Sequence, residues 1–272
     1  MKKSQVILLI VVIIAVGILY SLPRVVVDNT EENENFEQVD TAASASAEEI
    51  HSAELSLSDR EKLAQLSAKL EKVENKEKFA IFADSIASFY VSSGMYDSAA
   101  YVLAQRAEKF PEIKSWEKAG NAYYEAFGFA MEDEKATYLA NQTRKYLNKV
   151  LENDPSRLDL KTKVAMTYVS SSNPMQGIMM IREILEKDPQ NREALFNMGI
   201  LSMQSGQYKK AVGRFEDLVK YHPDHIQGQF YLGVSYFESK QKNKAKEQFQ
   251  KVKSITDDPM IISSVDNYLG QL

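Results

Sequence analysis

The sequence predicts an all-α protein, a solenoid of helix–turn–helix repeats preceded by one transmembrane helix. Three observations support this fold class: residues 6–22 form an uncharged apolar run, helical periodicity continues from Ser58 almost to the C-terminus without a strand pattern, and the helical region repeats itself every 34 residues. A chain of 272 residues, of which 44% are hydrophobic, is long enough to bury a core in one or two domains.

The composition excludes several classes of function. The chain has no cysteine, which excludes disulfides, a zinc ribbon, a thiol nucleophile and a lipid-modified cysteine. Its 33 basic and 38 acidic residues give a net charge of −5. Because a nucleic-acid binder needs a basic face, no nucleic acid is expected as a partner.

Residues 1–27 are predicted to form a cytoplasmic tip and a transmembrane signal-anchor helix. In the 17-residue run 6–22, 13 residues are Ile, Leu or Val, and together they contribute about −4 to −8 kcal/mol to membrane insertion. A cleaved signal peptide is the alternative. The anchor is favoured because the run is longer than a signal-peptide core of roughly 7 to 15 residues and no small-x-small cleavage site follows it directly.

The expected topology is a single pass through the inner (cytoplasmic) membrane. Lys2 and Lys3 precede the apolar run, so the positive-inside rule favours a cytoplasmic N-terminus and an extracytoplasmic repeat domain, periplasmic in a bacterium. Residues 28–57 contain nine acidic residues and no Lys or Arg, a composition typical of a disordered tether. An alternative role of this acidic run is to recruit a basic partner.

A flanking helix over residues 58–79, opened by a capping box of Ser58 and Glu61, is expected to lead into about five repeats over 80–259. The expected units are approximately 80–113, 114–157, 158–191, 192–225 and 226–259, with a C-terminal capping helix over 260–272. The unit 114–157 is irregular because its closing proline, Pro155, arrives late. That delay predicts elongated helices or a loop around residues 127–134.

The residues that recur at this period resemble those of the tetratricopeptide repeat family. Each pair has a small residue in the first helix and an alanine or glycine in the second, and it ends at a proline. The matching positions are Gly199 and Gly233, Ala211 and Ala245, Phe215 and Phe249, and Pro155, Pro189 and Pro223. The resemblance covers about 180 residues and implies a right-handed α-solenoid. The layout is also similar to that of ancillary and assembly proteins of this type in the bacterial cell envelope.

The resemblance further implies that the first helices line a concave groove. In the last two repeats the groove-facing residues are Phe196, Ile200, Met203, Phe230, Val234 and Phe237. Such an apolar face suits an amphipathic helix or an extended apolar peptide. The alternative is that these side chains pack against the following repeat or the terminal helix. In the N-terminal half the acids Asp84 and Glu117 stand on the corresponding face, so a polar or basic ligand is expected there.

No catalytic residue, cofactor or metal ligand is expected. His222 and His225 flank Pro223 on a turn between repeats, and the chain has neither a P-loop nor a dinucleotide-binding glycine fingerprint. The predicted function is therefore non-enzymatic: a membrane-anchored module that holds a client peptide or partner protein in assembly, chaperoning or secretion at the bacterial envelope. The alternatives are a homo-oligomeric scaffold without a separate client and, least favoured, an envelope enzyme or its accessory.

Overall fold

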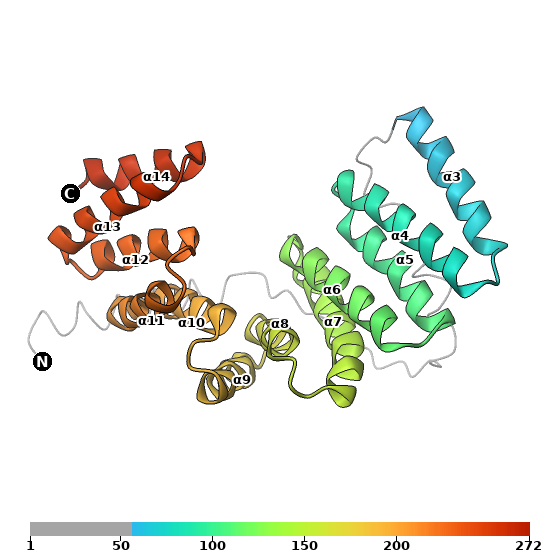
Figure 1. The fold of residues 1–272 in the computed structure, drawn as a ribbon, viewed down its shortest axis with the longest axis horizontal. Helices are drawn as coiled ribbons and strands as arrows, with labels where there is room; N and C mark the ends of the chain where they lie inside the picture. Colours follow the sequence, from blue (N-terminus) through green and yellow to red (C-terminus); the bar gives the residue numbers. More distant parts are fainter. Residues whose placement is uncertain (1–55) are drawn as a thin grey trace, which may run out of the picture. The chain divides into compact units, whose positions relative to one another are not determined.

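The structure, a computed structural model, describes residues 56–272, and within this range it contains twelve α-helices and no strand (Figure 1). The labels follow Figure 1. The helices are α3 (Leu57–Glu71), α4 (Lys76–Ser92), α5 (Tyr96–Lys109), α6 (Ile113–Gly128), α7 (Asp133–Asn153), α8 (Leu158–Val169), α9 (Pro174–Lys187), α10 (Arg192–Gln204), α11 (Tyr208–Tyr221), α12 (Ile226–Glu238), α13 (Lys242–Ile255) and α14 (Pro259–Gly270).

Ten of these helices form five consecutive pairs, from α4/α5 to α12/α13. Within each pair the two helices pack against each other, and the second helix also packs against the first helix of the next pair. The buried side chains form several hydrophobic clusters along the chain. Some partly buried residues pack against two of these clusters. Trp116, Met180 and Leu185 each contact two neighbouring clusters. The core is therefore shared between neighbours, as expected of stacked repeats.

Small residues in the first helices allow the two helices of a pair to approach. A Cβ atom added at Gly199 would lie 2.5 Å from Cζ of Phe215, and one added at Gly233 would lie 2.7 Å from Cε1 of Phe249. Both phenylalanines are fully buried. The glycines repeat at the period of 34 because each one makes room for the aromatic ring of its partner helix.

The N-terminal helices begin at different residues from those expected. Ser56, not Ser58, caps α3, and its Oγ accepts a hydrogen bond from the backbone N–H of Asp59 at 3.1 Å. The flanking helix predicted over 58–79 ends at Glu71. Asn75 then caps a new helix by accepting from the N–H of Lys78 at 3.0 Å, so residues 76–79 belong to α4.

The irregular unit over 114–157 consists of elongated helices. Helix α6 has 16 residues and α7 has 21, whereas α10 and α11 have 13 and 14. A short connection at Phe129–Glu132 joins them. Helix α7 is long because no proline or glycine interrupts it before Pro155. The late proline therefore reflects added helical turns.

The last helix, α14, starts at Pro259 behind a capping aspartate, Asp258, and packs against α12 and α13. None of the helices described in residues 56–272 has the length and hydropathy needed to cross a bilayer. The predicted transmembrane segment 6–22 and the acidic tether 28–57, apart from its last two residues, lie outside the described residues. Both remain predictions.

Candidate partner-binding surface

The first helices of the N-terminal pairs are joined to their neighbours by ion pairs. Asp84 of α4 accepts a hydrogen bond from Nη1 of Arg106 at 3.1 Å and one from Nζ of Lys118 at 2.6 Å. Arg106 is only 6% exposed, so Asp84 balances a buried guanidinium. Lys118 belongs to α6, and this contact therefore links the first helices of two successive pairs.

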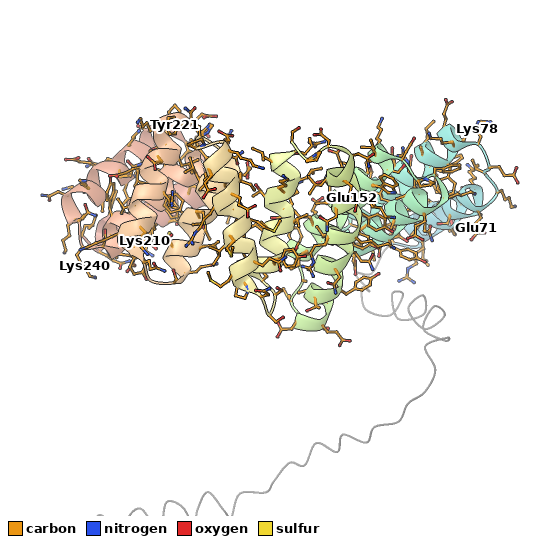
Figure 2. The ribbon with its side chains drawn as sticks, turned by 90° about the horizontal axis from the view of Figure 1, so that it is seen from below. Glu71, Lys78, Glu152, Lys210, Tyr221 and Lys240 are labelled. Carbon is orange, nitrogen blue, oxygen red and sulfur yellow. The ribbon has the colours of Figure 1, made fainter. Side chains whose placement is uncertain are left out.

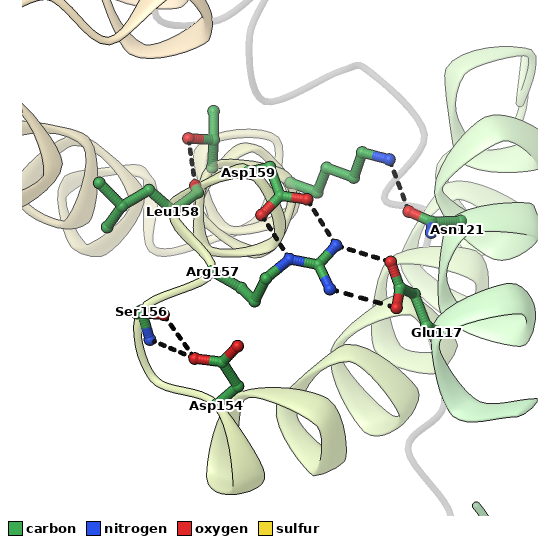
Figure 3. A network of polar contacts seen from close by, with 9 residues as sticks. Glu117, Asn121, Asp154, Ser156, Arg157, Leu158 and Asp159 are labelled. Carbon is green, nitrogen blue, oxygen red and sulfur yellow. Dashed lines mark hydrogen bonds and ion pairs between the residues drawn. The ribbon is translucent and has the colours of Figure 1, made fainter. Parts of the chain in front are cut away.

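A second polar network joins α6 to the start of α8 (Figure 3). Arg157 lies between two carboxylates: its Nη2 is 2.6 Å from Oε1 of Glu117 and 2.8 Å from Oδ2 of Asp159. The guanidinium holds the pKa of Asp159 below its usual value, mainly through this hydrogen bond. Lys163 of α8 donates to Oδ1 of Asn121 at 2.5 Å. The loop itself is held by Asp154, which accepts from the backbone and the hydroxyl of Ser156.

These contacts change the expectation for the N-terminal half of the surface. Asp84 and Glu117 were predicted to face a polar or basic ligand, but both already accept hydrogen bonds from basic side chains of the same chain. A basic ligand would therefore compete with Arg106 or Arg157 for these carboxylates. The acids on these first helices therefore join neighbouring pairs instead of standing free for a partner.

In the C-terminal half, aromatic contacts join neighbouring pairs alongside ion pairs such as Lys244–Glu216. Phe196 of α10 stacks on the ring of His225 at 5.0 Å between centroids and lies 5.9 Å from Tyr231 of α12. Tyr231 also stacks on Phe215 at 6.0 Å. Ring pairs at such distances add stabilisation beyond the area that they bury. Phe196 is thus partly engaged in packing between the last two pairs.

The residues predicted on α12 pack against α14. The ring of Tyr268 lies 6.1 Å from Phe230, 5.3 Å from Phe237 and 5.1 Å from Phe249. Val234 is only 5% exposed. The sequence left open whether these side chains line a groove or pack against the following repeat or the terminal helix. Phe230 and Phe237 contact Tyr268 of the terminal helix, and Val234 is buried in the same cluster. A partner would share these side chains with α14.

Ile200 and Met203 are the predicted groove residues on α10 besides Phe196. Both lie on α10, are half-buried, and pack beside the cluster formed by the last repeats. Their partial exposure and their spacing of three residues give α10 an accessible apolar strip. These two side chains are therefore partly accessible and are not covered by the ring of Tyr268, which lies against Phe230 and Phe237.

The two histidines near Pro223 have contacts that account for them. His222 Nε2 lies 2.7 Å from the carbonyl oxygen of Gln190, and His225 Nδ1 accepts from the N–H of Gly228 at 3.0 Å, which caps α12. Burial lowers the pKa of His225, and nearby Arg192 lowers it further. Among residues 56–272, no group of three or more His, Cys, Asp and Glu side chains is placed to hold a metal ion.

Sequence reasoning missed the residues that link one pair to the next. Tyr231 and Tyr268 make aromatic contacts between helices in the C-terminal half, and Arg157 makes the central ionic contact. A signal exists for Tyr268, because it stands on one face of α14 with Ile261 and Val265, at helical spacing. No spacing rule points to Arg157, since it pairs with Glu117, 40 residues earlier, in the irregular unit.

Comparison with known proteins supports the class of fold. A family model described as tetratricopeptide repeat matches residues 193–225 and 227–255. These two segments correspond to α10/α11 and α12/α13. The chain thus contains tetratricopeptide repeats over its last two pairs. No curated protein sequence matches the chain.

Solved structures extend this fold similarity beyond the two matched segments. A tetratricopeptide repeat protein from Parabacteroides merdae is 16% identical, with a TM-score of 0.55, covering 76% of this chain and 77% of that one. A thermophilic tetratricopeptide repeat protein from Thermus thermophilus is 12% identical, with a TM-score of 0.51, covering 69% of this chain and 97% of that one. At these identities the similarity concerns the fold alone.

Proposed function

We propose that the chain is a membrane-anchored protein-interaction module, in which residues 1–27 anchor the protein and the repeats hold a protein or peptide partner beyond the inner membrane. The proposal extends to a role in assembly, chaperoning or secretion at the bacterial envelope. The repeat fold supports an interaction role, because stacked pairs offer a long continuous surface. The apolar run at 6–22 and the lysines before it support the anchor and its orientation.

The observation that carries the binding site is the strip formed by Ile200 and Met203. These side chains are apolar and half-buried, and they stand on the first-helix face of a pair that matches the repeat family. Methionine adapts its shape to irregular apolar surfaces, which suits a peptide-binding position. A partner with an apolar helical face would remove this strip from water.

Site-specific photocrosslinking in cells tests the binding site. A photoreactive residue at Met203 is expected to capture one partner protein reproducibly, while the same residue at Gln250, exposed on α13, captures none. Phe230 and Phe237 are poor positions because their neighbour Tyr268 would be captured instead. Equal capture from both positions would contradict a partner site on the first-helix face, and capture of the protein itself would support the scaffold alternative.

Topology is tested separately with protease. In intact spheroplasts, protease added from outside is expected to degrade the repeat region, because that region lies outside the cytoplasmic membrane. In a variant with Lys2 and Lys3 changed to Glu, a fraction of the molecules should insert in the opposite orientation, because the basic flank directs the orientation of the anchor. The repeat region of that fraction should be protected from protease. Full protection of the unaltered chain would place the repeats in the cytoplasm and contradict the proposed localisation.

A further inference from the structure

A depression opens between α9, α10 and α11, away from the strip on α10. It has a volume of about 500 Å³, and its apolar lining includes Ile178, Met198 and Leu201. Neither Ile200 nor Met203 lines it. The second helices α9 and α11 supply its two walls, and α10 supplies its floor. We call this depression the α9–α11 cleft.

The cleft carries basic side chains that have no acidic partner. Arg182 stands on one wall, and Lys210 and Arg214 on the other. Across residues 56–272, the ion pairs found involve none of these three cations. Lys210 is exposed (Figure 2), and its only hydrogen bond is to Gln207. Asp217 is the single acid among the lining residues. Arg106 and Arg157 of the N-terminal half, by contrast, are held between carboxylates.

A glycine in the same wall lacks an explanation within the chain. Gly213 is the sixth residue of the 14-residue helix α11, and a Cβ added there would meet nothing within 4 Å. A helix-interior glycine lowers helix stability relative to alanine. Among the described glycines, the others stand at positive φ, at the end of a helix, or against a neighbouring atom. The open space at Gly213 would allow another backbone to approach α11 closely.

We propose that the α9–α11 cleft is a docking site for the chain's own acidic segment, residues 28–55. This segment has nine acids and no Lys or Arg, which complements the unpaired cations of the cleft. Phe36 and Val39, each next to an acid, supply apolar side chains for the floor. An extended backbone passing over Gly213 would use the space that an alanine methyl group would fill. Docking at this cleft does not depend on partner binding at Ile200 and Met203.

The segment is long enough to reach the cleft. Its 28 residues directly precede α3 and extend to roughly 90–100 Å. Six contacts between neighbouring helices lead from α3 to α9, and each adds about 8–10 Å between axes. That path of about 50–60 Å is an upper limit on the separation of the axes of α3 and α9. Once docked, the segment would hold the repeats closer to the membrane than an extended tether does.

The test is photocrosslinking within the full chain, with the reactive residue in place of Ser205, which lines the cleft and is exposed. Mass spectrometry of the captured peptides is expected to identify residues 28–55 of the same chain. Changing Arg182 and Arg214 together to Gln should lower this capture about three- to tenfold. The same change at Lys246 and Lys251, exposed on α13, should leave it unaltered.

The variant Gly213→Ala separates docking from folding. It should raise the melting temperature by about 2–4 °C, because alanine favours the helix, and yet reduce capture of residues 28–55. Gly270→Ala, at the end of α14 with open space around it, should not change capture. Capture of a different segment, of another copy or of another protein, or capture that Gly213→Ala leaves intact, would overturn the proposal.

Discussion

His225 shows how a single side chain couples this fold to pH. It caps α12 by accepting a hydrogen bond at Nδ1, is 9% exposed, and stacks on Phe196. Its pKa in the folded protein lies below the ordinary value of 6.5, chiefly because burial disfavours the charged ring. Above pH 6.5 both folded and unfolded states are neutral. As the pH falls below 6.5, the unfolded state binds the proton first, so the stability contributed by His225 is lost.

Urea unfolding at pH 7.5 and pH 5.5 measures this effect. We expect the unaltered chain to lose more stability between these two values than the variant His225→Asn, which keeps a capping side chain but does not titrate. His222→Asn serves as the matched control, because it removes the neighbouring histidine and leaves the cap of α12 in place. Identical pH dependence of His225→Asn and the unaltered chain would contradict the role assigned to this cap.

Lys240 occupies a backbone conformation that favours glycine. Its φ is 65°, close to the 74° of Gly94 and the 69° of Gly206, which stand at the corresponding turns of other pairs. The side chain of an L residue is strained there. Lys240→Gly should therefore raise the free energy of unfolding by about 0.5–1 kcal/mol, as measured in urea. Lys240→Ala removes the charge but keeps the Cβ. If it raises the free energy of unfolding as much as Lys240→Gly does, the gain comes from loss of the charge and not from relief of backbone strain.

At the scale of a helix, the fit between the two members of a pair depends on glycine at one position and tolerates a larger residue at another. Gly199→Ala adds a Cβ within 2.5 Å of the buried ring of Phe215. We expect it to destabilise the fold by about 1–3 kcal/mol in chemical unfolding. Gly213→Ala makes the same chemical change on the partner helix, where space is open, and should be stabilising by up to about 1 kcal/mol. Effects of the same sign would contradict this account.

The repeated contacts also explain which elements the sequence could predict. Helices α8, α10 and α12 begin at Leu158, Arg192 and Ile226, at intervals of 34, because their glycines and alanines meet the next helix in the same way each time. The boundary between α3 and α4 depends on Asn75, one capping side chain among several polar residues. Tyr268 belongs to α14, outside the repeats, so the period could not predict its cover over Phe230 and Phe237.

At the scale of the whole repeat region, stability is distributed along a chain of neighbours, so a local change should have a local effect. Tyr268→Ala removes the ring that α14 places against Phe230, Phe237 and Phe249. The loss is about 1–3 kcal/mol for a half-buried aromatic ring. It should speed amide exchange in α12–α14 and leave α4 and α5 unchanged, because α14 packs against α12 and α13 and three further helix pairs separate these from α4 and α5 in the stacking order.

Hydrogen exchange followed by mass spectrometry resolves this pattern helix by helix. Tyr101→Ala is the matched control: Tyr101 lies on α5 and is 47% exposed, and its loss should leave exchange in α12–α14 unaltered. If Tyr268→Ala accelerates exchange equally in α4 and α13, the region unfolds as one cooperative unit. That result would contradict the nearest-neighbour behaviour expected here. It would mean that the destabilisation spreads along the stack through the residues that contact two clusters, Trp116, Met180 and Leu185.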